Sequence, residues 1–311
     1  MGSQDILMEN AVVHFKVASG AVRAVDQVSV RFEAGKITGL IGESGCGKSV
    51  LGLSILGLLP SYACFAGDIV YDGLHILSAP QKELRALRGR KIGFIPQSSA
   101  DSLNPTRRIG SQLDEALRLV EKNAQRRRMR AVELLRGFGF DDPERILRAY
   151  PFELSGGMQQ RALCAIGVCC SPRWVLADEP TKGLDKDLCQ QAQEMLRSLH
   201  KFGADSMLVI THDLSFAENL CDIVAIMYAG QIVEMGEQVL KNPRHPYTQA
   251  YLSALPRNGM HPMAGAPPAP GYELPGCRFA SRCPYVVERC RIECPDAYTG
   301  EAGMVRCFLH A

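Results

Sequence analysis

Eight residues in the first part of the chain, 42–49, have the sequence GESGCGKS. They fit the pattern G-x-x-x-x-G-K-[ST] at each fixed position, and such a turn holds phosphate groups on its backbone N–H groups. An apolar stretch over residues 37–41 predicts a buried strand before the turn, and residues 50–59 predict an apolar-faced helix after it. The turn therefore opens a helix, and the positive N-terminal end of a helix favours an anion.

The candidate phosphate loop comprises Gly42, Glu43, Ser44, Gly45, Cys46, Gly47, Lys48, Ser49 and Val50. Lys48 supplies a mobile positive charge for β- and γ-phosphates, and Ser49 supplies a hydroxyl ligand for Mg²⁺. Upstream, Phe15 could stack on adenine, or it could pack in the core while Val22 lies against the base. An isolated match could also be a chance glycine-rich turn, so the phosphate-loop interpretation depends on the other motifs of the chain.

Two acids end a second apolar stretch. Residues 174–180 read WVLADEP and predict a buried strand followed by Asp178 and Glu179. Carboxylates directly after a buried strand have few structural roles. Asp178 is a candidate Mg²⁺ ligand, and Glu179 is a candidate general base that polarises a water for attack on a γ-phosphate.

Two more polar side chains follow predicted strands. Gln97 ends the stretch 91–97, and its amide could reach Mg²⁺ and the attacking water, although a solvent-facing loop residue is the alternative. His212 follows the apolar stretch 207–210. Because strands alternate with helices here, their carboxyl ends are expected at one sheet edge, where Gln97, Asp178 and His212 should meet.

A third motif, LSGGMQQR at residues 154–161, places two glycines after a serine at the start of an apolar helix. Ser155 is a good helix N-cap, and capping alone would explain the serine. Together with Gly156, Gly157 and Met158 it could also form a second anion-binding helix N-terminus. Such an end could meet a phosphate that is bound by a partner chain.

The elements that must position these residues predict an α/β chain with added layers. Residues 6–32 predict antiparallel strands, and residues 67–77 predict a hairpin that turns at Asp72-Gly73. Residues 101–170 predict a helical insertion, because strand signals fade there and helical periodicity appears over 109–121 and 124–136. Downstream, residues 242–256 predict a short helix and residues 257–275 a linker rich in proline and glycine.

Length and charge limit the class of protein. The 311 residues suffice for one large domain and a small one, and the net charge of +2 gives no support for nucleic acid as a partner. The first ten residues lack the features of a signal peptide. The longest apolar run is shorter than the roughly 20 residues that span a bilayer. A cytosolic location is therefore expected.

The chain has 12 cysteines, and they fall into two groups. Seven are scattered and are expected to be small buried hydrophobes: Cys46, Cys64, Cys164, Cys169, Cys170, Cys189 and Cys221. Five crowd the tail: Cys277, Cys283, Cys290, Cys294 and Cys307. Because disulfides are disfavoured in the cytosol, this crowding predicts a metal site.

The motifs and their order resemble those of ABC-type ATPases over about residues 5–255. The tail phrases NPRHPYTQAYLSALP and GCRFASRCPYVVERC resemble the oligopeptide/dipeptide/nickel permease family of ATP-binding subunits. The resemblance implies an α/β P-loop NTPase with a RecA-like core and an antiparallel β layer. It also implies a nucleotide-binding domain over 1–255, with a helical subdomain at about 99–171, and a Cys-rich extension over 256–311.

The resemblance also implies roles for the candidate residues. Two cassettes would enclose two ATP molecules head to tail, so that the end formed by Ser155, Gly156, Gly157 and Met158 would cap the partner's ATP. Asp178 would hold Mg²⁺ with Ser49 and Gln97, Glu179 would act as general base and His212 would contact the γ-phosphate. Asp185 would belong to the loop that links the two sites, although this chain reads TKGLD where relatives often read TTALD.

The implied partners are a second related ATP-binding subunit, two transmembrane permease subunits and an extracytoplasmic solute-binding protein. This places the chain at the cytoplasmic face of a membrane, with di- or oligopeptides or nickel, free or chelated, as solute. The alternatives are a soluble ABC ATPase not coupled to transport, and an iron–sulfur redox protein, which would not need an intact ATP site.

The tail cysteines allow two metals. Five, six and sixteen residues separate Cys277, Cys283, Cys290 and Cys307. Structural zinc sites usually pair cysteines two to four residues apart, and only Cys290 and Cys294, with three residues between them, come that close. The resemblance favours a [4Fe–4S] cluster on Cys277, Cys283, Cys290 and Cys307, with Cys294 left over, and zinc is the second choice.

Overall fold

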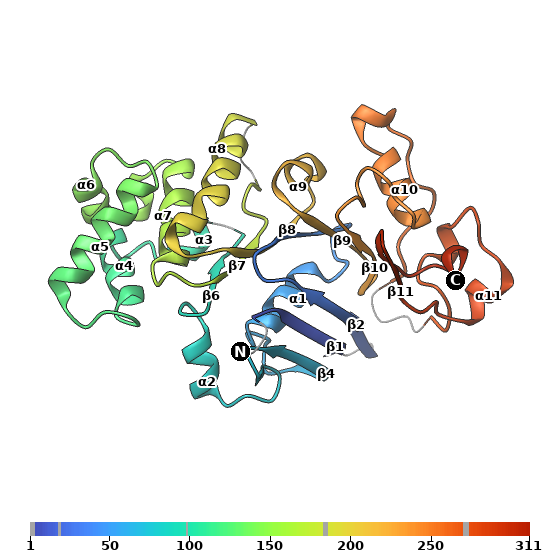
Figure 1. Cartoon of the computed structure of the whole chain (residues 1–311). Coiled ribbons are helices and arrows are strands. Elements are labelled where there is room, and N and C mark those ends of the chain that lie inside the picture. The colour runs from blue at the N-terminus through green and yellow to red at the C-terminus, as the bar shows by residue number, and fades with distance from the viewer. Residues whose placement is uncertain (1–3, 18–19, 98, 183–185, 270–273) are drawn as a thin grey trace. The chain divides into compact units, whose positions relative to one another are not determined.

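The computed structural model describes residues 4–17, 20–97, 99–182, 186–269 and 274–311 (Figure 1). The chain forms two compact units, one of residues 1–78 with 211–311 and the other of residues 79–210. We call them the first and the second unit. The division of the chain at residue 255, and the limits of the helical subdomain, stay predictions.

An antiparallel sheet of the first unit has the strand order β2-β1-β4-β5. Its strands are β1 (Ile6–Val17), β2 (Gly20–Phe32), β4 (Ala63–Tyr71) and β5 (Leu74–His75). The predicted antiparallel strands over 6–32 are confirmed, with Ile6 opposite Phe32. The hairpin turns at Asp72-Gly73 as predicted, and both residues have positive φ, 51° and 77°, as a tight hairpin turn requires.

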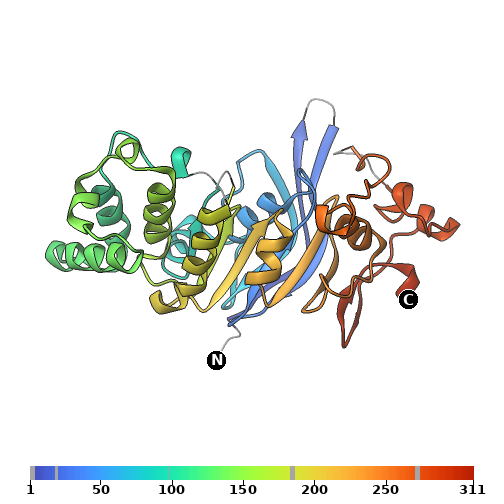
Figure 2. The same ribbon diagram turned by 90° about the horizontal axis from the view of Figure 1, so that it is seen from above.

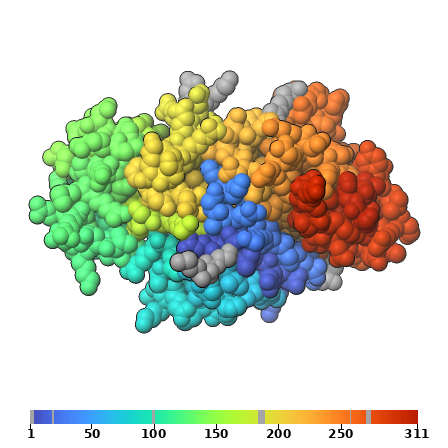
Figure 3. Space-filling model, in the orientation of Figure 1, coloured from blue at the N-terminus to red at the C-terminus, as the bar shows by residue number. Residues whose placement is uncertain are grey.

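A second group of strands in the first unit includes the C-terminal tail. β3 (Ile37–Ile41) pairs in parallel with β9 (Ile223–Tyr228), and β9 pairs in antiparallel fashion with β10 (Gln231–Gly236). The tail adds β12 (Gly303–Val305) beside β10 and then β11 (Tyr298–Gly300). The sequence pattern does not predict these two strands. Figures 2 and 3 show the C-terminal tail (red) lying beside the part of the chain that precedes it (orange).

Among its described residues, the first unit has four α-helices: α1 (Lys48–Ile55), α9 (Leu214–Leu220), α10 (Pro246–Ser253) and α11 (Glu288–Ile292). Two of them differ in extent from the prediction. α1 starts at Lys48, not at residue 50, and ends at Ile55 before Gly57, which has a positive φ of 58°. α10 is shorter than the predicted 242–256, because proline is favoured at the first helical position and Pro246 takes it.

The second unit contains three parallel strands in the order β8-β7-β6. They are β6 (Ile92–Ile95), β7 (Trp174–Asp178) and β8 (Ser206–Thr211), and each residue of β7 and β8 is buried. Strands buried on both faces read as continuous apolar runs, which explains why sequence analysis located them. β7 ends at Asp178 and not at residue 180, because Glu179 leaves the extended region with φ 48°.

The helices of the second unit include those of the predicted insertion. They are α2 (Gln81–Leu87), α3 (Ser99–Ser102), α4 (Ile109–Leu117), α5 (Ala124–Gly137), α6 (Pro143–Arg148), α7 (Gly156–Val168) and α8 (Lys186–Arg197). The helical periodicity over 124–136 is confirmed in α5, whereas the helix predicted over 109–121 forms as α4 but ends at Leu117. α7 starts at Gly156, immediately after the motif serine.

The seven scattered cysteines differ in how deeply they are buried. Cys46, Cys164, Cys169 and Cys170 are buried, as predicted, whereas Cys64, Cys189 and Cys221 are half-buried. Among the described residues, no helix combines the length and the apolar character that crossing a membrane requires.

Candidate functional site

The glycine-rich loop between β3 and α1 is pressed against neighbouring backbone. A Cβ atom on Gly42 would lie 2.1 Å from the carbonyl oxygen of Met227, and one on Gly47 would lie 1.9 Å from that of Ala24. Gly47 also has a φ of 108°, which side-chain-bearing residues rarely adopt. These two positions therefore require glycine, and the turn is a built feature of the fold rather than a chance composition.

Lys48 begins α1 and turns back over the loop. Its side chain is buried, and its ammonium donates hydrogen bonds to the carbonyls of Gly42, at 2.8 Å, and Glu43, at 3.0 Å. Ser44 and Gly45 are exposed, whereas Ser49 and Val50 are half-buried. Burial raises the pKa of the Cys46 thiol, so this cysteine of the loop packs as a neutral group.

Phe15, on β1, is half-buried opposite Val22. Its ring is tilted against Tyr62, with the two centroids 5.8 Å apart. Tyr62 is 64% exposed. The two alternatives for adenine, Phe15 and Val22, thus lie opposite each other on paired strands.

In the second unit, β7 delivers two buried acids to the carboxyl end of the parallel strands. Asp178 lies opposite Ile210 of β8 and is 6% exposed. Glu179 is 8% exposed, and its backbone N–H donates to the Ile210 carbonyl at 2.8 Å. A positive φ in a non-glycine residue is uncommon, and this conformation turns the chain sharply at the acid.

Gln97 is exposed and follows β6, which pairs in parallel with β7. The carboxyl ends of β6 and β7 therefore bring Gln97 and the two acids to one edge, as predicted. His212 is exposed and follows the end of β8. Asp185 lies outside the described residues.

The LSGGM motif opens α7 at its exposed end. Ser155 is the N-cap, and its hydroxyl accepts a hydrogen bond from the N–H of Met158 at 3.4 Å. Ser155 and Gly156 are exposed, whereas Gly157 and Met158 are half-buried. The helix carries no acidic residue in its first turn, so its N-terminal positive end is open to an external anion.

Four tail cysteines line one cavity of the first unit. This cavity of about 250 Å³, the cysteine cavity, is lined by Cys277, Cys283, Cys290 and Cys307 together with mostly apolar side chains such as Phe279, Tyr285 and Phe308. Cys294 is not among them, and its sulfur lies 3.7 Å from the Gln231 amide nitrogen. Among the described residues, no group of three or more His, Cys, Asp or Glu side chains is preformed as a metal site.

Burial controls the thiol chemistry of this cavity. Burial is the main cause that raises the pKa of Cys277 to about 12, and the neighbouring Cys290, Cys307 and Cys283 act in the same direction. Burial likewise raises the pKa of Cys283 and of Cys307. The cavity therefore favours neutral thiols unless a cation offsets the charge of the thiolates.

Two residues that no sequence motif predicts hold the phosphate loop from the C-terminal side. The Tyr247 hydroxyl accepts a hydrogen bond from the N–H of Glu43 at 3.2 Å, and the Arg282 guanidinium contacts the Glu43 carboxylate at 3.2 Å. Tyr247 and Arg282 lie 204 and 239 residues beyond Glu43. No local pattern signals contacts at such separations.

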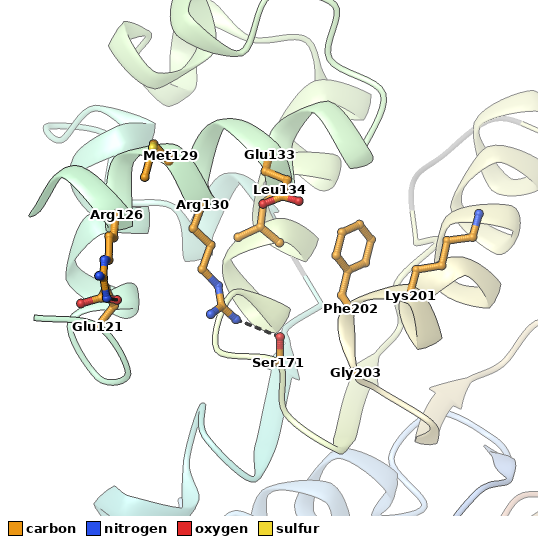
Figure 4. A pocket seen from close by; sticks show the side chains of 10 residues that line it. All are labelled: Glu121, Arg126, Met129, Arg130, Glu133, Leu134, Ser171, Lys201, Phe202 and Gly203. Carbon is orange, nitrogen blue, oxygen red and sulfur yellow. Dashed lines mark hydrogen bonds and ion pairs between the residues drawn. The ribbon is translucent and has the colours of Figure 1, made fainter. Parts of the chain in front are cut away.

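A larger hollow, of about 590 Å³, lies in the second unit (Figure 4). Its lining includes Arg126, Arg130 and Lys201 with Glu121 and Glu133, and none of the motif residues. Arg130 donates to the Ser171 hydroxyl at 2.8 Å across it. Its wall carries both cations and anions, so its charge favours no class of ligand.

Comparisons with known proteins define the class. Residues 25–182 match the family profile described as ABC transporter. Residues 233–290 match that of the oligopeptide/dipeptide transporter C-terminal region. An ATP-binding cassette, MJ0796, solved as a post-hydrolysis dimer with ADP and Pi, has a TM-score of 0.66 at 26% identity, and the match covers 75% of this chain and 98% of that one.

Curated relatives extend the match to almost the whole chain. The oligopeptide transport ATP-binding protein AppD of Bacillus subtilis (strain 168) is 37% identical over 97% of this chain and 96% of its own. The dipeptide transport ATP-binding protein DppD of Escherichia coli (strain K12) is 39% identical over 91% and 89%. The chain belongs to the ABC transporter family, in the group with the oligopeptide/dipeptide transporter C-terminal region, which confirms the predicted fold class and family.

Proposed function

We propose that this chain binds and hydrolyses ATP to energise an ABC importer of di- and oligopeptides. The observation that carries the proposal is the glycine-rich loop, in which two positions require glycine and a buried lysine begins the following helix. The names of the relatives add the class of solute. They favour peptides over nickel, the other solute that the resemblance allows.

The chain's own groups account for phosphate binding. Backbone N–H groups of residues 42–47 and the N-terminal end of α1 would receive the β-phosphate, and Lys48 would exchange its contacts to Gly42 and Glu43 for phosphate oxygens. Phe15, with Tyr62 beside it, would offer the adenine an aromatic surface.

Ser49, Gln97 and Asp178 would hold Mg²⁺, because a hydroxyl, an amide and a carboxylate are the oxygen donors that this hard cation prefers. When bound, Mg²⁺ would neutralise charge that develops on the β- and γ-phosphate oxygens. Glu179 would accept a proton from the attacking water, and its burial keeps bulk water from competing for the carboxylate. His212 would contact the γ-phosphate.

Hydrolysis would require a second, related ATP-binding subunit. The exposed N-terminal end of α7, with Ser155, Gly156, Gly157 and Met158, would cap the ATP held by the partner. The partner's equivalent end would cap the ATP at residues 42–49. Asp185 would lie in the loop that couples the two sites.

Transport would require further proteins. Two transmembrane permease subunits would form the path for the solute, and an extracytoplasmic binding protein would deliver it. The chain would act at the cytoplasmic face of the membrane, with no nucleic acid as partner. The soluble ABC ATPase alternative loses support, because the C-terminal region matches that of peptide transporters.

The test is ATP hydrolysis by the complex of this chain, its partner ATPase and the permease subunits in lipid vesicles. Binding protein loaded with di- or oligopeptide should stimulate hydrolysis when added from the external side. Binding protein without peptide is the control, and nickel-loaded binding protein is the competing arm. Stimulation by nickel alone would refute peptides as the solute, and no stimulation by either would refute a peptide or nickel importer.

We also propose a [4Fe–4S] cluster on Cys277, Cys283, Cys290 and Cys307. Two observations support it: the four cysteines line one cavity, and the fifth tail cysteine, Cys294, lies beside Gln231 instead. Four thiolates are the usual ligand set of such a cluster. Iron would supply the cation that the buried thiols need in order to lose their protons. Zinc is the second choice.

The cluster makes a prediction about colour and metal content. Protein purified without oxygen should be brown and contain about four irons per chain. Cys283→Ser should lose the colour, whereas Cys294→Ser, the matched control, should keep it. Absorbance and iron analysis measure both. Colourless anaerobic protein with one zinc per chain would refute the cluster and leave the ATPase proposal intact.

A further inference from the structure

One short segment of the tail, CRFASRC at residues 277–283, contacts two sites at once. Four of its residues line the cysteine cavity: Cys277, Phe279, Ala280 and Cys283. Its two arginines bond instead to acids near the nucleotide site, Arg278 to Asp26 and Arg282 to Glu43. The same seven residues thus line part of the cysteine cavity and contact the phosphate loop.

The contact between Arg282 and Glu43 is sheltered from solvent. The Arg282 side chain is 5% exposed, and its Nη1 lies 3.2 and 3.3 Å from the two carboxylate oxygens of Glu43. The same nitrogen lies 3.3 Å from the Tyr228 hydroxyl. Charge-assisted bonds of this kind are the stronger class of hydrogen bond, and burial protects them from screening by salt.

Two further hydrogen bonds hold the backbone of Glu43. Its carbonyl accepts from Lys48, and its N–H donates to Tyr247. One residue of the phosphate loop therefore receives three independent contacts, of which Arg282 and Tyr247 supply two from the C-terminal part of the chain. The backbone N–H groups that would face phosphate belong to this same turn.

Phe279 fixes the segment between the two sites. It is 1% exposed and packs edge-on against Tyr228, with the centroids 5.4 Å apart. It also packs against Tyr247, at 5.5 Å. These two tyrosines are the ones that contact Arg282 and Glu43, so a shift of the segment would reach the phosphate loop through packed side chains as well as through the ion pair.

We propose that Arg282 is a positioning residue for the phosphate loop, and that the occupant of the cysteine cavity sets ATP affinity through it. This inference rests on the proposed phosphate site and on the proposed metal in the cavity. A metal bound to Cys277 and Cys283 fixes both ends of the segment. Arg282, next to Cys283, is then held beside Glu43 with little further loss of conformational freedom on ATP binding.

Loss of a cysteine ligand frees one end of the segment. Arg282 then loses conformational freedom each time that the loop binds ATP, and this entropy loss weakens the affinity for ATP. The effect is expected on ATP binding rather than on the hydrolytic step, because Arg282 and Glu43 are not among the residues to which we assign catalysis.

The first test measures the dissociation constant for ATP with the anaerobically purified full chain. Arg282→Met should raise it roughly 5-fold or more, the lower end of the range for coupling between distinct sites, while the iron content stays unchanged. Arg282→Lys should restore part of the affinity, because an ammonium keeps the charge but not the planar fork. Arg85→Met, at an exposed position of α2, is the matched control and should bind ATP as the unaltered chain does.

The second test asks if the cavity acts through Arg282. Cys283→Ser alone should weaken ATP binding about as much as Arg282→Met, and the double variant should be no weaker than either, because both changes break one link. If Arg282→Met does not fold, Glu43→Gln removes the other half of the ion pair and should give the same loss.

Three outcomes overturn the inference or separate it from its premises. ATP affinity unchanged in Arg282→Met or Glu43→Gln refutes the positioning role. Losses that add in the double variant, or no loss in Cys283→Ser, refute the link to the cavity. ATP binding that survives in Lys48→Ala refutes instead the phosphate site on which the inference rests.

Discussion

Glu179→Gln in the assembled complex lowers the rate of ATP hydrolysis by about 10²- to 10⁴-fold, the loss typical of a missing general base. The amide is close in size to the carboxylate but cannot accept the proton of the attacking water. ATP binding is retained, because the phosphate loop lies elsewhere in the sequence and Asp178 still offers an oxygen to Mg²⁺. The measurement is single-turnover hydrolysis with nucleotide binding followed in parallel.

The similar size of the two side chains makes Glu179→Gln a test of chemistry rather than of folding. The Glu179 backbone N–H donates to the Ile210 carbonyl, and this bond does not depend on the side chain. Glu83→Gln, at an exposed position of α2, is the control and should hydrolyse ATP normally. Full hydrolysis by the Glu179→Gln complex would mean that another group is the base or that the partner's site carries turnover, and blocking each site in turn separates the two.

Ser155→Arg should abolish most hydrolysis at the partner's ATP and leave ATP at Lys48 bound as before. A long side chain at the exposed N-terminal end of α7 fills the space in front of the helix N–H groups. Loss of one donor aimed at developing charge typically costs about 10²- to 10³-fold in rate. Nucleotide occupancy of each site, measured in the complex with one site labelled, checks the assignment.

The control for the helix cap is Ser155→Ala, which removes only the hydroxyl that accepts from Met158. It should cost about 1 kcal/mol of helix stability and much less hydrolysis than Ser155→Arg. If Ser155→Arg empties the site at Lys48 of the same chain instead, the head-to-tail arrangement is wrong.

Local patterns were sufficient for β7 and β8, the glycine-rich loop and the acid pair. β7 and β8 are buried on both faces and therefore read as apolar runs, and the glycines of residues 42–47 follow from a motif with a fixed spacing. β11 and β12 have three residues each, too few for any periodicity, and their pairing depends on β10, some 70 residues earlier. Those strands could not be predicted from the sequence.

The candidate site also contains residues that could be predicted from the sequence and residues that could not. The four cysteines of the cavity could be chosen from sequence and family resemblance, and the cavity is lined by the same four. The contacts of Arg282 and Tyr247 with Glu43 could not, because tertiary packing alone brings such distant residues together. Val22 stays an alternative to Phe15, since strand pairing puts both at the same register position.

The long separation between Glu43 and Arg282 also matters during synthesis. At about 5–20 residues per second, a ribosome adds the 239 residues between them in roughly 10–50 s. During that interval the nascent chain carries a complete glycine-rich turn whose C-terminal brace has not yet been made. β10 meanwhile has an unpaired edge, and such edges invite association with other chains. A stop codon shortly before Arg282 would therefore damage the nucleotide site and solubility together, although every motif residue of the ATP site would still be present.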